Sequence, residues 1–211
     1  MIIKYCTVCL LITFIYSCVP APVGVDTAGI DAKNKTIAIL PFGLEKDNEA
    51  LQVPEGYLQR FNHSMHESLF NSLHSTLVID LNKSYEILRN TESYDNSFAE
   101  FSAQSGADYI LTGFVSHYKQ RVGGDLGVES PAAVSFLTRL YDAKTGALLW
   151  QYFYTEQQSP LFENIAEVGK FFKRKGKWVT VWELTEEGII ITANKIKELL
   201  EANANNTGDR P

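Results

Sequence analysis

Residues 134–155 read VSFLTRLYDAKTGALLWQYFYT. The first half alternates between an apolar face and a polar face, which is typical of a β-strand with one side buried. The apolar positions are Val134, Phe136 and Leu140, and the polar positions are Ser135 and Arg139. The segment 142–146 ends in a glycine that can take a positive φ, so it predicts a bulged turn into a returning strand over 148–155. Trp150, Tyr152 and Tyr154 share one face of that strand.

The segment just before this hairpin predicts a helix followed by a long strand. Ser97 and Glu100 have the spacing of a capping box, and Phe98 and Phe101 follow at helical positions. Gly106 is placed to end that helix. The run ADYILTGFV over 107–115 then predicts the start of a long strand.

Farther upstream, two strands flank a helix. The run TIAILPF over 36–42 is compact, apolar and ends at a proline, which predicts a buried strand. Apolar residues at helical spacing follow, namely Leu58, Phe61, Met65, Leu69 and Leu73. The run TLVID over 76–80 predicts a second strand.

The last element expected is a closing helix. Thr180 and Glu183 repeat the capping-box spacing. One apolar stripe runs along this helix through Leu184, Gly188, Thr192, Ile196, Leu199 and Leu200. The order is therefore βαβα, three strands, then α, with a right-handed crossover between the first strands. This order predicts an α/β (α+β) fold in which helices pack on a mixed sheet of about five strands.

Three of these stretches resemble one group of bacterial envelope lipoproteins. They are 37–42 (IAILPF), 107–113 (ADYILTG) and 141–150 (YDAKTGALLW). The group includes the curli-secretion channel lipoprotein, the lipoprotein activators of penicillin-binding proteins and the amino-terminal domain of the Tol-system propeller protein. The resemblance implies a non-catalytic α/β domain used for assembly at the envelope. A secretion channel needs further lipid-facing strands, and the strands expected here already belong to the sheet.

The amino terminus has the layout of an export signal. Lys4 precedes an apolar run from Tyr5 to Tyr16, which is too short to span a membrane as a helix. The run ends in Ile15-Tyr16-Ser17-Cys18, which resembles the lipobox of bacterial lipoproteins, although Tyr16 is bulkier than the usual residue. That resemblance implies cleavage before Cys18, attachment of diacylglycerol to its sulfur and acylation of the new amino terminus, as with palmitate. An ordinary cleaved secretory signal is the alternative.

The expected organisation follows from this signal. Residues 1–17 would be the signal peptide, 18–34 a lipidated tether, 35–202 a single domain and 203–211 a disordered tail. Val19 follows the cysteine, and in lipoprotein sorting a residue other than Asp there implies the outer membrane. We therefore expect a lipid-anchored protein of the outer membrane that faces the periplasm.

The composition excludes several classes of function. The net charge of −6 becomes −7 once Lys4 leaves with residues 1–17, and such an acidic chain is unsuited to bulk nucleic-acid binding. Cys6 and Cys9 leave with the same segment, so the remaining 194 of 211 residues have no disulfide and no cysteine-based metal site. No cofactor is expected.

Two motif pairs are compatible with catalysis or metal binding. Ser116-His117-Tyr118-Lys119 and Lys144-Thr145-Gly146 match the S-x-x-K and K-T-G motifs of penicillin-binding enzymes. However, Ser116 lies in a strand pattern rather than opening a helix, so we expect no enzyme. His63 and His66, beside Glu67, share a helical face, but no third ligand follows at a fixed spacing, so a polar surface is the preferred interpretation.

Two loops complete the set of candidates. Residues 123–127 (GGDLG) are glycine-rich but lead to Pro131 and a strand, which favours a hairpin loop over a phosphate site. The segment 168–182 is basic and aromatic in an acidic chain, and it could contact anionic lipid, glycan or an acidic partner. The candidate contacts are Lys170, Phe171, Phe172, Lys173, Arg174, Lys175, Lys177 and Trp178.

These observations favour a non-catalytic assembly, scaffolding or regulatory factor whose partners are the membrane, through Cys18, and other envelope proteins. Two alternatives remain open. One is a periplasmic module that binds anionic lipid or glycan through residues 170–178, and the other is a periplasmic hydrolase that uses Ser116, His117 and Lys119.

Overall fold

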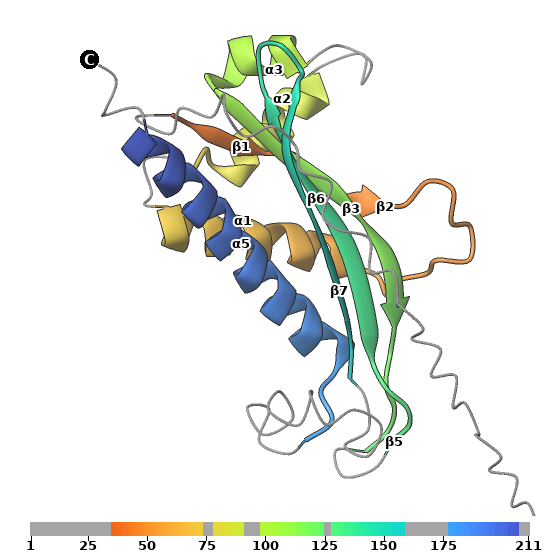
Figure 1. Ribbon diagram of the computed structural model, residues 1–211. Helices are drawn as coiled ribbons and strands as arrows, with labels where there is room; N and C mark the ends of the chain where they lie inside the picture. Colours follow the sequence, from red (N-terminus) through yellow and green to blue (C-terminus); the bar gives the residue numbers. More distant parts are fainter. Residues whose placement is uncertain (1–34, 74–77, 91–97, 125–127, 159–176, 207–211) are drawn as a thin grey trace, which may run out of the picture.

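A computed structural model describes residues 35–73, 78–90, 98–124, 128–158 and 177–206. The chain forms a five-stranded mixed sheet in the order β1–β3–β6–β7, with β2 beside β3 on the same side as β1 (Figure 1). The strands are β1 (Ile37–Ile39), β2 (Gly43–Leu44), β3 (Tyr109–Lys119), β6 (Ala133–Asp142) and β7 (Leu148–Gln157). β1 and β2 run parallel to β3, and the other pairs are antiparallel. The predicted α/β fold with a mixed sheet of about five strands is confirmed.

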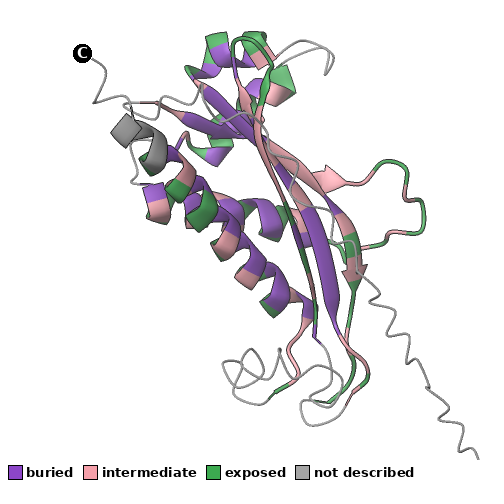
Figure 2. Cartoon of the chain, in the orientation of Figure 1, coloured by how far each residue is buried: buried purple, intermediate pink, exposed green. Residues whose placement is uncertain are grey.

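Helices pack on both faces of the sheet, but unequally. The long helices α1 (Tyr57–Leu73) and α5 (Val181–Asn206) lie on one face of the sheet (Figure 1). Their buried residues, coloured purple in Figure 2, belong to the same core cluster as buried residues of the strands. The short helices α2 (Leu81–Asn90) and α3 (Phe98–Ser105) gather over one end of the other face. A two-stranded sheet of β4 (Val122–Gly123) and β5 (Val128–Ser130) extends the opposite end.

The hairpin β6–β7 confirms the prediction that opened the sequence. Val134, Phe136 and Leu140 are fully buried in the core between the sheet and the two long helices. Gly146 takes a φ of 72°, and the register shifts between Leu140 and Tyr141, so the turn is bulged as expected.

The run 36–42 does not form one continuous strand. β1 ends at Ile39 and β2 resumes at Gly43, because Pro41 has no N–H to give to the β3 ladder. Asn62 of α1 closes the gap, since its Oδ1 accepts a hydrogen bond from the Phe42 N–H at 2.7 Å and its Nδ2 donates to the Phe42 carbonyl at 3.4 Å. A buried polar side chain thus replaces the missing ladder bonds.

The strand predicted over 76–80 is described only from residue 78 onward, and there it is reduced to a single bridge. Among described residues, only Val78 bridges to Ile37. Asp80 ends the extended stretch because its Oδ1 accepts the N–H groups of Asn82 at 2.9 Å and Lys83 at 3.3 Å, which caps α2. None of the sequence patterns above predicts α2. The helix predicted before Gly106 is confirmed as α3, and Gly106 has a φ of 78°.

The closing helix confirms its predicted cap. The Thr180 N–H donates to Glu183 Oε2 at 2.6 Å, and the Glu183 N–H donates to Thr180 Oγ1 at 3.2 Å. Gly188 lies against the Tyr154 ring, and a Cβ there would overlap that ring. This close approach brings α5 directly onto β7.

Candidate interaction surface

One face of the sheet carries a surface that no described helix packs against. The helices α2 and α3 cover one end of this face. Along the rest of it, strand pairing aligns side chains of β3, β6 and β7 in rows. The four rows are Thr112–Arg139–Gln151, Phe114–Leu137–Phe153, His117–Ser135–Thr155 and Lys119–Ala133–Gln157. We call these twelve side chains the open face. They lie opposite the core because neighbouring residues of a strand point to opposite sides.

An apolar row crosses the middle of the open face. Phe114 and Leu137 are half-buried, while Phe153 is 53% exposed. Aromatic and branched side chains that lie opposite one another across strands stabilise a sheet, but the outer end of this row still faces solvent. An exposed aromatic residue continuing a half-buried apolar row is typical of a contact surface.

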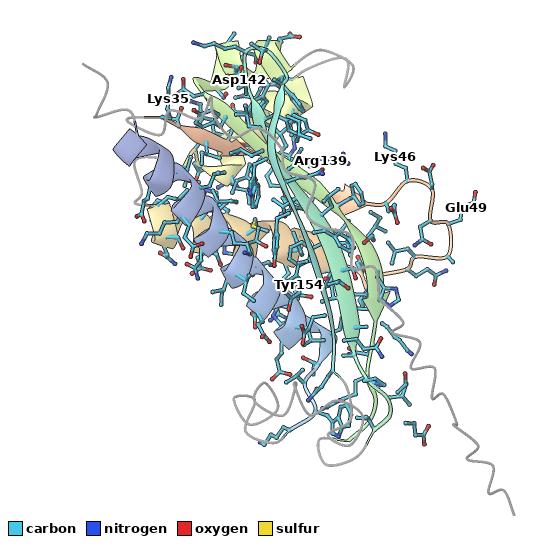
Figure 3. The ribbon with its side chains drawn as sticks, viewed as in Figure 1. Lys35, Lys46, Glu49, Arg139, Asp142 and Tyr154 are labelled. Carbon is cyan, nitrogen blue, oxygen red and sulfur yellow. The ribbon has the colours of Figure 1, made fainter. Side chains whose placement is uncertain are left out.

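Arg139 is the main cation of this surface. Its guanidinium lies 5.7 Å from the centre of the Phe114 ring, and its Nε is buried with no hydrogen-bond partner among the described residues. Figure 3 shows Arg139 and Tyr154 on opposite sides of the sheet, with Tyr154 turned toward α5. A guanidinium offers five N–H donors, so Arg139 is suited to receive a carboxylate from outside the domain.

The charge of the open face is opposite to that of the chain as a whole. Its twelve positions include Arg139, His117 and Lys119 but no Asp or Glu. The loop after β2 carries charges of both signs, and Figure 3 shows Lys46 and Glu49 in it. The surface is therefore basic and apolar on a chain whose net charge is −6.

The two enzyme-like motifs lie at opposite ends of the sheet. Ser116 is the extra residue of a bulge between Val115 and His117, its carbonyl accepts a hydrogen bond from Asn48, and its Oγ contacts the Ser135 carbonyl at 3.4 Å. The K-T-G motif forms the turn at the far end of β6. The two sites are separated by roughly 25 Å at the rise of an extended strand.

The K-T-G residues are explained by the turn itself. Oδ1 of Asp142 accepts hydrogen bonds from the Thr145 N–H at 2.7 Å, the Thr145 hydroxyl at 2.8 Å and the Lys144 N–H at 3.0 Å. Burial acts to raise the pKa of Asp142, but these hydrogen bonds and the charge of Lys144 outweigh it and lower that pKa. The carboxylate thus holds the turn in its charged form.

The histidine pair on α1 is not brought together with further ligands. His63 is exposed, and a ring nitrogen of His66 lies 3.1 Å from the Ile79 carbonyl, with its ring stacked near Phe70. In the part of the chain that is described, no group of three His, Cys, Asp or Glu side chains could hold a metal ion. The glycine-rich loop 123–127 lies largely outside the described residues.

Most of the basic and aromatic residues of the segment 168–182 also lie outside the described part of the chain. Residues 170–175 and the lipidation candidate Cys18 are not among the described residues, whereas Lys177 is exposed and Trp178 is half-buried. Gln158 is buried and ties the two ends of the segment together, since its Nε2 donates to the Lys177 carbonyl at 2.9 Å and its Oε1 accepts the Val179 N–H at 2.8 Å. Arg121 donates to the Trp178 carbonyl. Within the described ranges, no helix is long and apolar enough to cross a membrane.

The sequence interpretation missed the apolar row of the open face. The alternation in the sequence correctly places Arg139 on the side opposite the core, but the sequence analysis does not identify Phe114, Leu137 and Phe153 as a row. Their signal was available, because all three alternate with buried positions on their strands. What the alternation could not reveal is that no described helix packs on that half of the sheet.

No family model and no curated protein matches this chain. The solved structures that are similar to it include the following three. The PelC dodecamer from Paraburkholderia phytofirmans has 13% identity, coverage of 76% of this chain and 86% of that one, and a TM-score of 0.46. The hypothetical protein CT253 from Chlamydia trachomatis has 15% identity, coverage of 80% and 99%, and a TM-score of 0.48. The lipoprotein GNA1162 from Neisseria meningitidis has 16% identity, coverage of 66% and 92%, and a TM-score of 0.40.

Proposed function

We propose that this chain is a lipid-anchored, non-catalytic protein of the bacterial envelope. The anchor is Cys18, and the α/β domain is held at a membrane surface where it contacts other envelope proteins as an assembly, scaffolding or regulatory factor. The outer membrane, with the domain in the periplasm, is the location that Val19 favours.

The observation that carries this proposal is the position of Cys18. It stands directly after a short apolar run that begins behind Lys4, and residues rich in small side chains and proline separate it from the first strand. A diacylglycerol on one cysteine supplies enough buried CH₂ groups to hold a protein at a bilayer, and a third acyl chain strengthens that attachment.

The domain itself is suited to binding. Its enzyme-like motifs are spread over both ends of the sheet, and Ser116 and Lys144 are held in a bulge and a turn. By contrast, the open face offers an apolar row and an arginine whose buried Nε has no hydrogen-bond partner among the described residues. This distribution favours a binding role over the hydrolase alternative.

The anchor is tested by expressing the full chain in a bacterium that processes lipoproteins and separating its proteins by detergent phase partition. We expect the wild-type chain in the detergent-rich phase and Cys18→Ala in the aqueous phase, because the variant has no sulfur to alkylate. Mass spectrometry of the wild-type chain should show cleavage before Cys18 and added acyl mass.

The matched control is Cys9→Ala. Like Cys18→Ala it removes one thiol, but Cys9 lies inside the leader, and the apolar run of the leader is kept. It should partition like the wild-type chain. If Cys18→Ala stays in the detergent-rich phase, or if the purified chain keeps its leader, the lipid anchor is wrong.

The anionic lipid or glycan alternative depends on residues 170–178, of which only Lys177 and Trp178 are described. The clamp at Gln158 fixes where that segment leaves and rejoins the domain. Its role in binding stays a prediction.

A further inference from the structure

The outer side of α5 carries an acidic stripe. Its members point away from the sheet because they recur every three or four residues along the helix, opposite the buried stripe. We define the acidic stripe as Glu183, Glu186, Glu187, Ile190, Asn194, Glu198 and Glu201. Ile190 lies at its middle and is 54% exposed.

Two described cations form ion pairs with members of this stripe. Arg60 lies 3.6 Å from Glu186, and Lys197 lies 3.8 Å from Glu201. The Lys195 ammonium is turned to the Tyr152 ring, 5.0 Å from its centre. The stripe itself contains five carboxylates and no basic side chain, arranged around an exposed isoleucine.

The open face and the acidic stripe are complementary in charge and in apolar content. One presents three basic side chains without a carboxylate, and the other presents five carboxylates. Each has an exposed apolar side chain near its middle, Phe153 in one and Ile190 in the other, with nearly equal exposure of 53% and 54%. Opposite charges around a desolvated apolar centre are the arrangement of a specific interface.

The two surfaces also match in length, and a helix is the type of element that already packs on this face of the sheet. The open face spans about 23 Å along β3 from residue 112 to 119. The acidic stripe spans about 27 Å from residue 183 to 201. The other end of the same sheet face already accepts α2 and α3, so helices pack readily on this side of the strands.

We propose that a second copy of this chain docks its acidic stripe on the open face. A glutamate of the stripe reaches the Arg139 guanidinium, and Ile190 packs on the row of Phe114, Leu137 and Phe153. Because the two surfaces lie on opposite sides of one domain, the contact is head-to-tail, and repetition produces a ring or a filament. The contact is made by the domain and does not require the lipid on Cys18.

The test uses two variants of the full chain. The sheet variant is His117→Glu/Lys119→Glu, and the helix variant is Glu187→Lys/Glu198→Lys/Glu201→Lys, which leaves two Glu against three Lys in the acidic stripe. In each variant both surfaces now have the same sign, so each should self-associate about tenfold or more weakly than the wild-type chain. In an equimolar mixture, the acidic sheet face of one meets the basic helix of the other, and the reverse pair also matches. Association should therefore return only in the mixture.

The measurement is the weight-average mass by analytical ultracentrifugation of the full chain in detergent, over a range of concentration and salt. The wild-type chain should form oligomers that dissociate as salt rises. Phe153→Ser and Ile190→Ser should each weaken association, whereas Val122→Ser should not, since Val122 is 51% exposed but outside both surfaces. Circular dichroism checks that all variants are folded.

Three results would overturn the proposal. They are a wild-type chain that stays monomeric, variants that self-associate like the wild-type chain, and folded variants whose mixture does not regain association. If the sheet variant instead loses binding to anionic vesicles, the occupant is a membrane and the proposal is wrong. Repeating the measurement on Cys18→Ala separates this contact from the anchor, because association through α5 should persist without the lipid.

Discussion

At the scale of single residues, Gly113 marks a place where the backbone of β3 is closely surrounded by its neighbours. Gly113 on β3 faces the Phe42 ring at the break between β1 and β2, where Asn62 holds the Phe42 backbone. A Cβ at Gly113 would collide with the Leu137 carbonyl oxygen and would lie 2.6 Å from Cε1 of Phe42. The glycine is thus required by space rather than by backbone conformation.

Gly113→Ala should lower the free energy of unfolding by about 1–3 kcal/mol, because backbone atoms on the neighbouring strand cannot move aside without breaking the ladder. Urea denaturation followed by circular dichroism gives this value. Gly43→Ala is the matched control on β2, where an added Cβ meets nothing within 4 Å. It should leave stability unchanged or raise it by about 0.5 kcal/mol. Equal urea midpoints for the two variants would contradict the steric argument.

At the scale of elements, Tyr57 connects the starts of the two long helices. Its hydroxyl lies 2.9 Å from Thr185 Oγ1 on α5, and its ring meets Trp182 edge-on at 5.9 Å between centroids. Burial raises the pKa of Tyr57 to about 12, and the nearby Tyr118 adds to the shift, while the hydrogen bond with Thr185 opposes it. The helix pair therefore packs around a tyrosine that is held neutral.

This shift predicts a loss of stability at alkaline pH. Between the ordinary pKa of 10.0 and about 12, the unfolded chain releases the Tyr57 proton and the folded chain keeps it. Stability therefore falls as pH rises through this window, by about 2–3 kcal/mol from this residue. Tyr57→Phe should unfold with a shallower dependence on pH in that range. Urea denaturation at pH 8 and pH 11 measures the difference, and an unchanged slope would contradict it.

At the scale of the whole molecule, strand pairing and core packing are unevenly distributed between the two faces of the sheet. β3 and β6 are paired on both sides, and the core between the sheet and the long helices holds most of the fully buried side chains. The helices α2 and α3 rest on a smaller cluster of buried residues, which are Ala38, Ile87, Phe101, Ala107, Ile110 and Ala143.

Hydrogen exchange should reproduce this difference. Amides of β3 and β6 should exchange slowest, near the rate set by global unfolding, and amides of α2 should exchange at least about tenfold faster through local opening. Mass spectrometry of peptides from the two regions measures both rates under one condition. Equal protection of α2 and β6 would mean that the molecule opens only as one unit.

The sequence by itself determined the elements whose signals are local. The β6–β7 hairpin, the cap of α5 and the end of α3 at Gly106 follow from side-chain period, capping residues and a glycine with positive φ, which act over a few positions along the chain. The candidate anchor at Cys18 is likewise a local motif, and it stays a prediction.

Only the tertiary structure decided the rest. The alternation along a strand defines two faces but does not say which of them a helix will pack against. The open face therefore follows only from the tertiary structure, in which α1 and α5 pack on the other side of the sheet. The break of 36–42 into β1 and β2 depends on Asn62, which lies on α1. After its bridge at Val78 the chain leaves the sheet for a helix that Asp80 caps. These outcomes depend on contacts between distant segments, whose free energies are set by packing rather than by the local pattern.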